Sequence, residues 1–315
     1  EGLSEAEAQA RVIRERSLVP VAQELQRLLK ERLGKAVEVR VAPDSITEAA
    51  SETERLVLST PVGGITVLEN LRFHEEEQSR DVKTRQAHAR RLYRLADVVV
   101  NDSAGNWHNA ADASTADIPV HTPRVAGRLI EAEAKILNPI ITNPEHPIAL
   151  VFGGGPKFED KVPFLLGIVQ RLLDGQKGDA VFIGSGPAST FNEAQRLLAE
   201  GVDVTTVTDK SVVTARQILQ ITAEKQLALH LPKDLEPLDI GPATRAEWEG
   251  RLAGEQLGAG EQAFKLVIWN GPPGVFEQEE SSEGTKAVVR AVNTAIESGQ
   301  TKVVILGGDT VAAAR

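Results

Sequence analysis

Charged side chains beside glycine-rich turns are the residues of this chain that could do chemistry. Lys157 and Lys161 follow the apolar segment 148–152 through a run of glycines, and Asp309 follows segment 303–306 through a glycine pair. Glycine lets the backbone approach a ligand closely, and a helix N-terminus offers free N–H groups to an anion. The two lysines lie four residues apart, and they disfavour a helix start unless an anion binds there. We expect a phosphate-rich ligand, with Asp309 as a Mg²⁺ ligand.

Two other apolar segments end in turns of the same kind. Segment 180–183 leads into Gly184-Ser185-Gly186-Pro187, and segment 266–269 leads into a turn that begins at Asn270 and reaches Glu277. One such turn is usually a plain tight turn, but several in one sheet favour a nucleotide. The sequence has no Walker A pattern, so an ordinary P-loop protein is excluded.

The elements that must position these turns alternate along the second half of the chain. We expect strands at 148–152, 180–183, 228–231, 266–269 and 303–306, and helices at 160–174, 190–200, 211–226, 244–256 and 284–298. Runs of Val, Ile and Leu between helices are typical of a parallel sheet covered on both faces. Ligands bind at the carboxyl ends of the strands in such a sheet, so the turns should meet at one edge.

The first half of the chain has shorter patterns. We expect a helix capped by Ser17 and stopped by Gly34, a loop or short helix at 44–62, strands at 65–68 and 97–100, a basic helix at 79–96 and an amphipathic helix at 125–141. Prolines near the end of the last helix indicate a domain boundary. We therefore expect a first domain at 1–124, an interdomain helix at 125–141 and a second domain at 142–315.

Composition excludes several classes of protein. The chain has 315 residues, which suits one large or two ordinary α/β domains, and a formal net charge of −10. An acidic surface argues against nucleic acid as a partner. The absence of cysteine excludes disulfides and thiolate sites, and no apolar run of about 18 residues predicts a membrane span. We expect a cytoplasmic protein, with an organelle as the alternative, and a monomer.

Several blocks of the sequence, in order along residues 17–315, resemble the phosphoglycerate kinase family. They are Ser17 to Ala22, Leu68 to Phe73, Val100 to Asp102, Phe152 to Lys161, Ile183 to Phe191, Asp239 to Pro242, Trp269 to Glu277, Gly284-Thr285, and Gly307 to Thr310. The resemblance implies two Rossmann-like α/β domains with parallel sheets covered by helices, joined by the interdomain helix. It places a triose phosphate on the first domain and a magnesium nucleotide on the second.

The resemblance also implies an activity and the residues that carry it. The expected enzyme moves a phosphoryl group between 1,3-bisphosphoglycerate and ADP, or between ATP and 3-phosphoglycerate in reverse, in glycolysis and gluconeogenesis. By motif position, Lys157 is catalytic and Asp309 binds Mg²⁺. The residues implied for substrate are Arg72, His108 and Asn109, and those for the nucleotide are Gly154, Gly155, Lys161, Gly184, Gly186, Asn270, Glu277, Gly308 and Thr310.

The chain departs from the family pattern in several places. The blocks "DFNVP", "SHLGRP" and "STGGGASLE" are absent, the stretch between Asp234 and Leu238 is short, and the sequence begins with Glu1 rather than Met. We expect a partial record of a longer protein. Asn109 stands where the family has a substrate-binding arginine, and an amide cannot supply the charged bidentate contact.

These departures leave other hypotheses open. One is a structural or regulatory component of an assembly, with a degenerate triose site. A dinucleotide dehydrogenase would fit the sheet but lacks the expected fingerprint. Among single features, we expect the arginines of the 79–96 helix, including Arg85, to form a solvated face. We expect Trp107, Trp248 and Trp269 to serve in packing rather than as stacking platforms.

Overall fold

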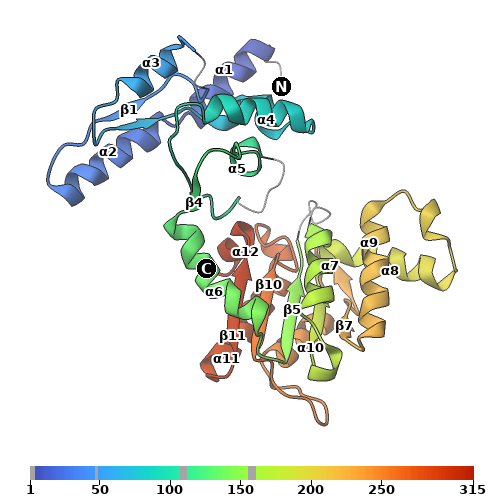
Figure 1. Cartoon of the computed structure of the whole chain (residues 1–315). Coiled ribbons are helices and arrows are strands. Elements are labelled where there is room, and N and C mark those ends of the chain that lie inside the picture. Colours follow the sequence, from blue (N-terminus) through green and yellow to red (C-terminus); the bar gives the residue numbers. More distant parts are fainter. Residues whose placement is uncertain (1–3, 47–48, 107–111, 155–160) are drawn as a thin grey trace. The chain divides into compact units, whose positions relative to one another are not determined.

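The computed structural model describes residues 4–46, 49–106, 112–154 and 161–315. The chain forms two compact units, Glu1–Ile136 and Leu137–Arg315 (Figure 1). The division between them falls inside helix α6 (Arg128–Thr142). Among the described residues, no helix combines the length and the apolar character that crossing a membrane requires.

The second unit is built on a parallel sheet of five strands in the order β11-β10-β5-β6-β7. The strands are β5 (Ile148–Phe152), β6 (Ala180–Ile183), β7 (Ala228–His230), β10 (Leu266–Asn270) and β11 (Lys302–Leu306). All neighbouring pairs are parallel. The central strand β5 is fully buried, as its continuous apolar run predicts. The predicted α/β fold with a parallel sheet is confirmed.

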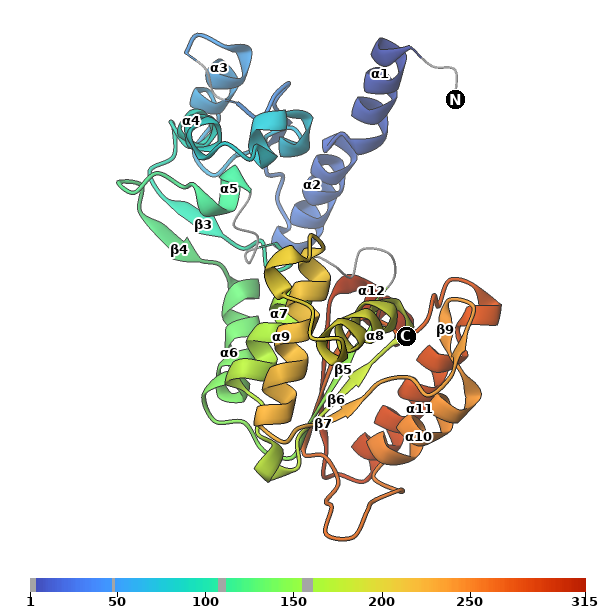
Figure 2. The same ribbon diagram turned by 90° about the vertical axis from the view of Figure 1, so that its right-hand side faces the viewer.

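Helices cover both faces of this sheet. On one face lie α7 (Val162–Arg171), α8 (Ser185–Ala199) and α9 (Lys210–Glu224), and on the other lie α10 (Pro242–Leu252) and α11 (Glu283–Glu297) (Figure 2). Alternate strand residues enter the two cores, so Leu150 packs with α7 and α9 while Val151 packs with α10 and α11. Trp248 and Trp269 are completely buried in the second core, which confirms their predicted packing role.

The rest of the second unit consists of short elements. They are η4 (Gly175–Lys177), η5 (Val204–Thr206), the hairpin β8 (Leu235–Glu236) and β9 (Asp239–Ile240), η6 (Glu279–Ser281), and α12 (Gly308–Ala313). The hairpin is antiparallel and lies outside the main sheet. The sequence did not predict the hairpin or α12, because neither is long enough to show a hydrophobic period.

The first unit has two separate sheets of two parallel strands. In the first sheet β1 (Val39–Val41) pairs with β2 (Ile65–Val67), and in the second β3 (Val99–Asn101) pairs with β4 (Arg124–Ala126). Around them lie α1 (Glu5–Arg16), α2 (Val19–Leu33), α3 (Glu52–Leu58), η1 (Leu71–Phe73), η2 (Glu75–Gln78), α4 (Val82–Leu92) and α5 (Ala113–Ala116). The strands β1 and β4 and the helix α1 were not predicted.

The predicted start of the helix after Ser17 needs correction. Helix α2 begins at Val19, and its N-cap residue, Leu18, makes no capping hydrogen bond through its side chain. The predicted cap, Ser17, lies one residue before this N-cap, where its hydroxyl oxygen accepts the Val19 N–H at 3.3 Å and its hydroxyl hydrogen is donated to the Glu69 carboxylate. The predicted end is right, because Gly34 follows the helix with a left-handed φ of 65°.

The arginines of α4 do not all face solvent. Arg85 is buried, and its guanidinium pairs with Asp117 at 2.8 Å and donates to the Ser79 carbonyl at 2.8 Å. A buried guanidinium needs such partners because losing water is costly for a charge. The prediction of a solvated arginine face is therefore wrong for Arg85. Arg90 is exposed, as predicted.

Candidate functional site

The predicted glycine turns of the second unit lie at one edge of the sheet. They follow β5, β6, β10 and β11, which are neighbours in a parallel sheet, so their carboxyl ends point the same way. The turns are also bonded to one another. Gly153 N–H donates to the Asn270 carbonyl at 3.0 Å, Gly154 N–H to the Pro272 carbonyl at 2.9 Å, and Ser185 N–H to the Pro273 carbonyl at 3.0 Å.

Close packing of these turns explains part of their glycine content. A Cβ atom added to Gly153 would come closer than 3.0 Å to the Pro272 carbonyl oxygen, and one added to Gly271 would do the same to the Gly153 oxygen. Gly271 also has a φ of 90°, which favours glycine. At Gly308, by contrast, an added Cβ would meet nothing within 4 Å. The glycines therefore divide into those that the loops need for packing and those beside open space.

The loop after β11 connects to the loop after β10 through Thr310. This residue is 1% exposed, and its Oγ1 accepts the Gly271 N–H at 2.8 Å. Asp309, one residue earlier in α12, is exposed. The two neighbouring predicted residues therefore have different surroundings: Thr310 is hydrogen-bonded inside the protein, and Asp309 faces outward.

The remaining nucleotide-side residues lie around the same edge. Lys161 is half-buried and directly precedes α7, while Gly184 and Gly186 lie at the start of α8. Asn270 is half-buried at the end of β10, and Glu277 is exposed in the loop that follows. Lys157 and Gly155 lie outside the described residues. The structure therefore brings the described part of the predicted nucleotide set to one edge.

The residues at this edge suit Mg²⁺ bound together with phosphate. Among the residues that the structure describes, no group of three or more His, Asp or Glu side chains could hold a metal ion by itself. Mg²⁺ in nucleotide sites is usually held by one or two carboxylates, with phosphate oxygens and water completing the octahedron. The exposed carboxylate of Asp309 fits that arrangement.

In the first unit, the predicted substrate residue Arg72 is held by a buried carboxylate. Its Nη2 pairs with Asp112 Oδ2 at 3.0 Å, and Asp112 is completely buried. Asp112 also accepts from Gln78 Nε2 at 3.0 Å and from the Asn106 side chain. The Arg72 side chain remains 44% exposed, so it is partly open to solvent. His108 and Asn109 lie outside the described residues.

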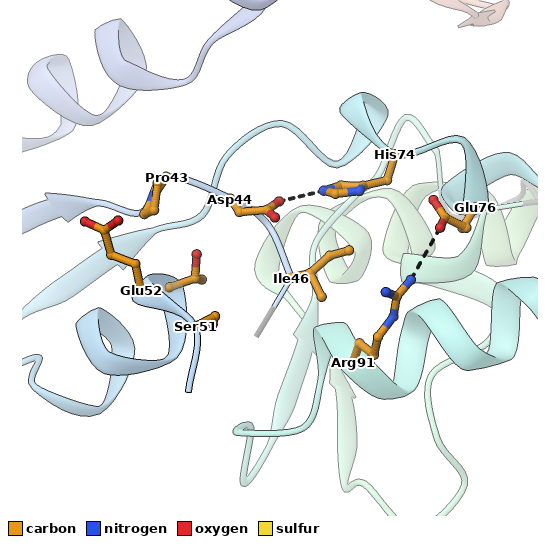
Figure 3. A pocket seen from close by; sticks show the side chains of 9 residues that line it. Pro43, Asp44, Ile46, Ser51, Glu52, His74, Glu76 and Arg91 are labelled. Atoms are coloured by element: carbon orange, nitrogen blue, oxygen red, sulfur yellow. Dashed lines mark hydrogen bonds and ion pairs between the residues drawn. The ribbon is translucent and has the colours of Figure 1, made fainter. Parts of the chain in front are cut away.

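A cavity of 380 Å³ in the first unit contains none of the predicted site residues (Figure 3). Its lining includes two ionic contacts, between His74 and Asp44 at 2.6 Å and between Arg91 and Glu76 at 3.5 Å. Burial raises the pKa of the Asp44 carboxyl, but the hydrogen bond from His74 helps to hold that pKa below its usual value. Glu52 adds another carboxylate to the lining, so this cavity does not suit a phosphate.

A cavity of 580 Å³ in the second unit lies at the opposite edge of the sheet. It is lined by residues that precede or begin the strands, among them Pro147, Asp179 and Ala228. Asp179 is buried, and its carboxylate accepts from the Ile148 N–H at 2.6 Å and the Asp174 N–H at 2.7 Å. Asp179 therefore stabilises the start of β5 from a position just before β6. The cavity is separate from the glycine turns, which lie at the carboxyl ends of the strands.

Comparisons with known proteins identify the family of this chain. The family described as "Phosphoglycerate kinase" matches residues 3–237 and 232–315. The phosphoglycerate kinase of Synechococcus sp. (strain JA-3-3Ab) is 35% identical over 321 residues, covering 94% of this chain and 70% of the relative. That of Moorella thermoacetica is 35% identical over 327 residues, covering 96% of this chain and 74% of the relative.

A solved structure shows the same fold. Phosphoglycerate kinase from Coxiella burnetii matches with a TM-score of 0.61 and 26% identity, over 94% of this chain and 71% of that one. The hypothesis of a structural or regulatory component gains no support from these relatives, and neither does that of a dehydrogenase. The family resemblance predicted from the sequence motifs is confirmed, and the chain belongs to the phosphoglycerate kinase family of phosphotransferases.

Proposed function

We propose that this chain transfers a phosphoryl group between 1,3-bisphosphoglycerate and ADP, and between ATP and 3-phosphoglycerate in reverse. In the forward direction, the bond from phosphorus to the acyl oxygen breaks, and a bond forms from phosphorus to a β-phosphate oxygen of ADP. The observation that carries the proposal is the meeting of four glycine turns at the carboxyl edge of one parallel sheet.

The second unit would bind the nucleotide at this edge. The first amides of α8, beside Gly184 and Gly186, and the ammonium group of Lys161 before α7 would contact phosphate oxygens. Asn270 and Glu277, on the loop after β10, would contact the phosphate and the ribose. The open space above Gly308 would admit the phosphates to the backbone.

The charges at the site would serve the transfer itself. Phosphoryl transfer needs positioning and neutralisation of charge more than covalent help from the protein. Asp309 would hold Mg²⁺, which when bound neutralises charge on the phosphate oxygens. Lys157 would contact the phosphoryl group in transit. Thr310 is buried, so it would serve the nucleotide through the loop after β10, whose Gly271 N–H its hydroxyl accepts.

The first unit would bind the triose. Arg72, oriented by Asp112, would present its guanidinium to the substrate phosphate. His108 and Asn109 would complete this set. We assign triose binding to residues 1–124 and nucleotide binding to residues 142–315. The helix predicted at 125–141 is α6, which begins only at Arg128 because Arg124–Ala126 form strand β4.

A coupled assay with 3-phosphoglycerate and MgATP tests the proposal. The intact protein should turn over, and Lys157→Ala should abolish turnover, because the phosphoryl group would lose its cationic contact. Lys177→Ala is the matched control, since Lys177 is exposed and lines the cavity at the opposite edge of the sheet. A protein that does not turn over, or a Lys157→Ala variant as active as the parent, would refute the proposed activity.

A further inference from the structure

The sequence block Asp239-Ile240-Gly241-Pro242 contains a buried carboxylate that the proposed site does not use. Asp239, in β9, is completely buried. Its Oδ2 accepts the Gly284 N–H at 2.7 Å, and its Oδ1 accepts the Ile240 N–H at 2.8 Å. Gly284 lies in the first turn of α11, where backbone amides carry a partial positive charge. The carboxylate therefore joins the β8–β9 hairpin to the start of α11.

Two glycines bring the backbone against this carboxylate. A Cβ atom added to Gly274 would come closer than 3.0 Å to Asp239 Oδ1 and to the Ser281 carbonyl oxygen. One added to Gly284 would also come closer than 3.0 Å to Asp239 Oδ1. Gly274 belongs to the loop after β10, which carries Asn270 at its start. That loop and the first turn of α11 are thus packed around a single charged group.

Carbonyl groups of the hairpin turn hold the same loop and the η6 turn that follows it. Val275 N–H donates to the Leu238 carbonyl at 3.0 Å, and the Ser281 hydroxyl donates to the Pro237 carbonyl at 3.0 Å. Leu238 has a φ of 62°, in the left-handed region that a leucine adopts only when its surroundings enforce it. The turn is therefore fixed in the conformation that makes these contacts.

The burial of Asp239 has an electrostatic cost. Loss of water raises the pKa of its carboxyl, while the Gly284 and Ile240 amides and the nearby Arg245 oppose the rise. Arg245 Nη1 lies 3.9 Å from Asp239 Oδ2 and is shared with Glu236, which faces the same carboxylate. An uncompensated buried charge would be strongly destabilising, so these contacts act together to keep the carboxylate in place.

We propose that Asp239 is a positioning residue that fixes the loop 271–277 for nucleotide binding. This inference rests on the proposed function, because that loop carries Glu277 and begins next to Asn270. Asp239 is completely buried, so it would not contact the nucleotide directly. It acts through the Gly274 and Val275 backbone and through the start of α11.

The test compares Asp239→Asn with a matched variant of the same hairpin. Both oxygens of Asp239 accept backbone N–H groups, so an amide NH₂ in that place must face a donor. Asp234→Asn makes the same change at a carboxylate that accepts the Ala243 and Thr244 N–H groups at 2.9 and 2.8 Å, at the start of α10. We expect both variants to lower Tm, but only Asp239→Asn to weaken ADP binding by calorimetry, by about tenfold.

Kinetics and hydrogen exchange separate positioning from a general loss of stability. Asp239→Asn should raise KM for ATP and leave KM for 3-phosphoglycerate unchanged. The amides of Gly271 and of residues 274–277 should exchange faster than in Asp234→Asn. Gly274→Ala provides a second variant if Asp239→Asn does not fold, with Gly241→Ala, next to Asp234, as its control. Variants that bind ADP as the active parent does would overturn the inference alone, whereas a parent that binds no ADP would overturn the proposed function with it.

Discussion

The Thr310 hydroxyl accepts the Gly271 N–H at 2.8 Å and so joins the turns that follow two neighbouring strands. Thr310 is 1% exposed, and Gly271 is buried as well. A buried N–H needs a partner, because leaving it unpaired costs the full penalty of removing it from water. One side chain therefore couples the loop after β10 to the helix that carries Asp309.

Removing the Thr310 hydroxyl should lower the stability of the protein. Thr310→Val keeps the shape of the side chain but leaves the Gly271 N–H unpaired, so we expect the free energy of unfolding to fall by about 1–3 kcal/mol. Thr310→Ser keeps the hydroxyl and should lose much less. Urea unfolding of both variants measures the difference. Equal losses for Val and Ser would show that the hydrogen bond does not carry the effect.

The two kinds of glycine at the site should respond differently to alanine. In Gly271→Ala the new Cβ would clash with the Gly153 carbonyl at a φ of 90°, so we expect a large loss of stability. In Gly308→Ala the Cβ meets open space, so we expect normal stability and a raised KM for ATP, because the methyl group would occupy space meant for phosphate. Tm and steady-state kinetics check both. A Gly308→Ala variant with unchanged KM would argue against phosphate at that position.

Arg72 should affect the triose side alone. In Arg72→Lys the ammonium cannot hold Asp112 and a substrate phosphate with the same planar geometry, so we expect KM for 3-phosphoglycerate to rise by about tenfold. KM for ATP should not change. Arg90→Lys, at an exposed position of the same unit, is the control. A rise in KM for ATP instead would contradict the assignment of Arg72.

Buried His88 should make stability depend on pH. Burial lowers the pKa of His88 below its ordinary value of 6.5, so the unfolded chain binds this proton more readily than the folded one. Its contribution to stability is therefore present at neutral pH and is lost as the pH falls through 6.5. Burial raises the pKa of the neighbouring Glu77, whose Oε2 lies 3.5 Å from His88 Nε2, and this gives the opposite trend.

Thermal unfolding at about pH 7.5 and about pH 5.5 measures the net effect of His88. The parent should lose more of its Tm on acidification than His88→Gln, which has no imidazole to protonate. His121→Gln, at an exposed position of the same unit, should behave as the parent does. A steeper loss in His88→Gln than in the parent would reverse the predicted sign.

The parallel sheet could be predicted from the sequence because its strands are unbroken apolar runs. The predicted bounds of β5 and β6 match those of the structure. Strands β1 and β4 could not be predicted in this way. Each of these strands contains an arginine, so neither forms the unbroken apolar run that indicates a buried strand.

The candidate site also has features that the sequence predicts and features that it does not. The convergence of the glycine turns follows from parallel strands, so local patterns were enough to predict it. The contacts that support the site depend instead on residues far apart in the chain. Gly271 and Thr310 are 39 positions apart, and Arg72 and Asp112 are 40 apart, so no local pattern indicates that they meet.

Calorimetric titration with MgADP tests the central claim most directly, because it requires no turnover and no triose. We predict that the intact protein binds the nucleotide, that Lys161→Ala binds it at least about tenfold more weakly, and that Lys177→Ala binds it as the parent does. A parent that takes up no MgADP, or a Lys161→Ala variant with unchanged affinity, would contradict the claim that the carboxyl edge of this sheet is a nucleotide site.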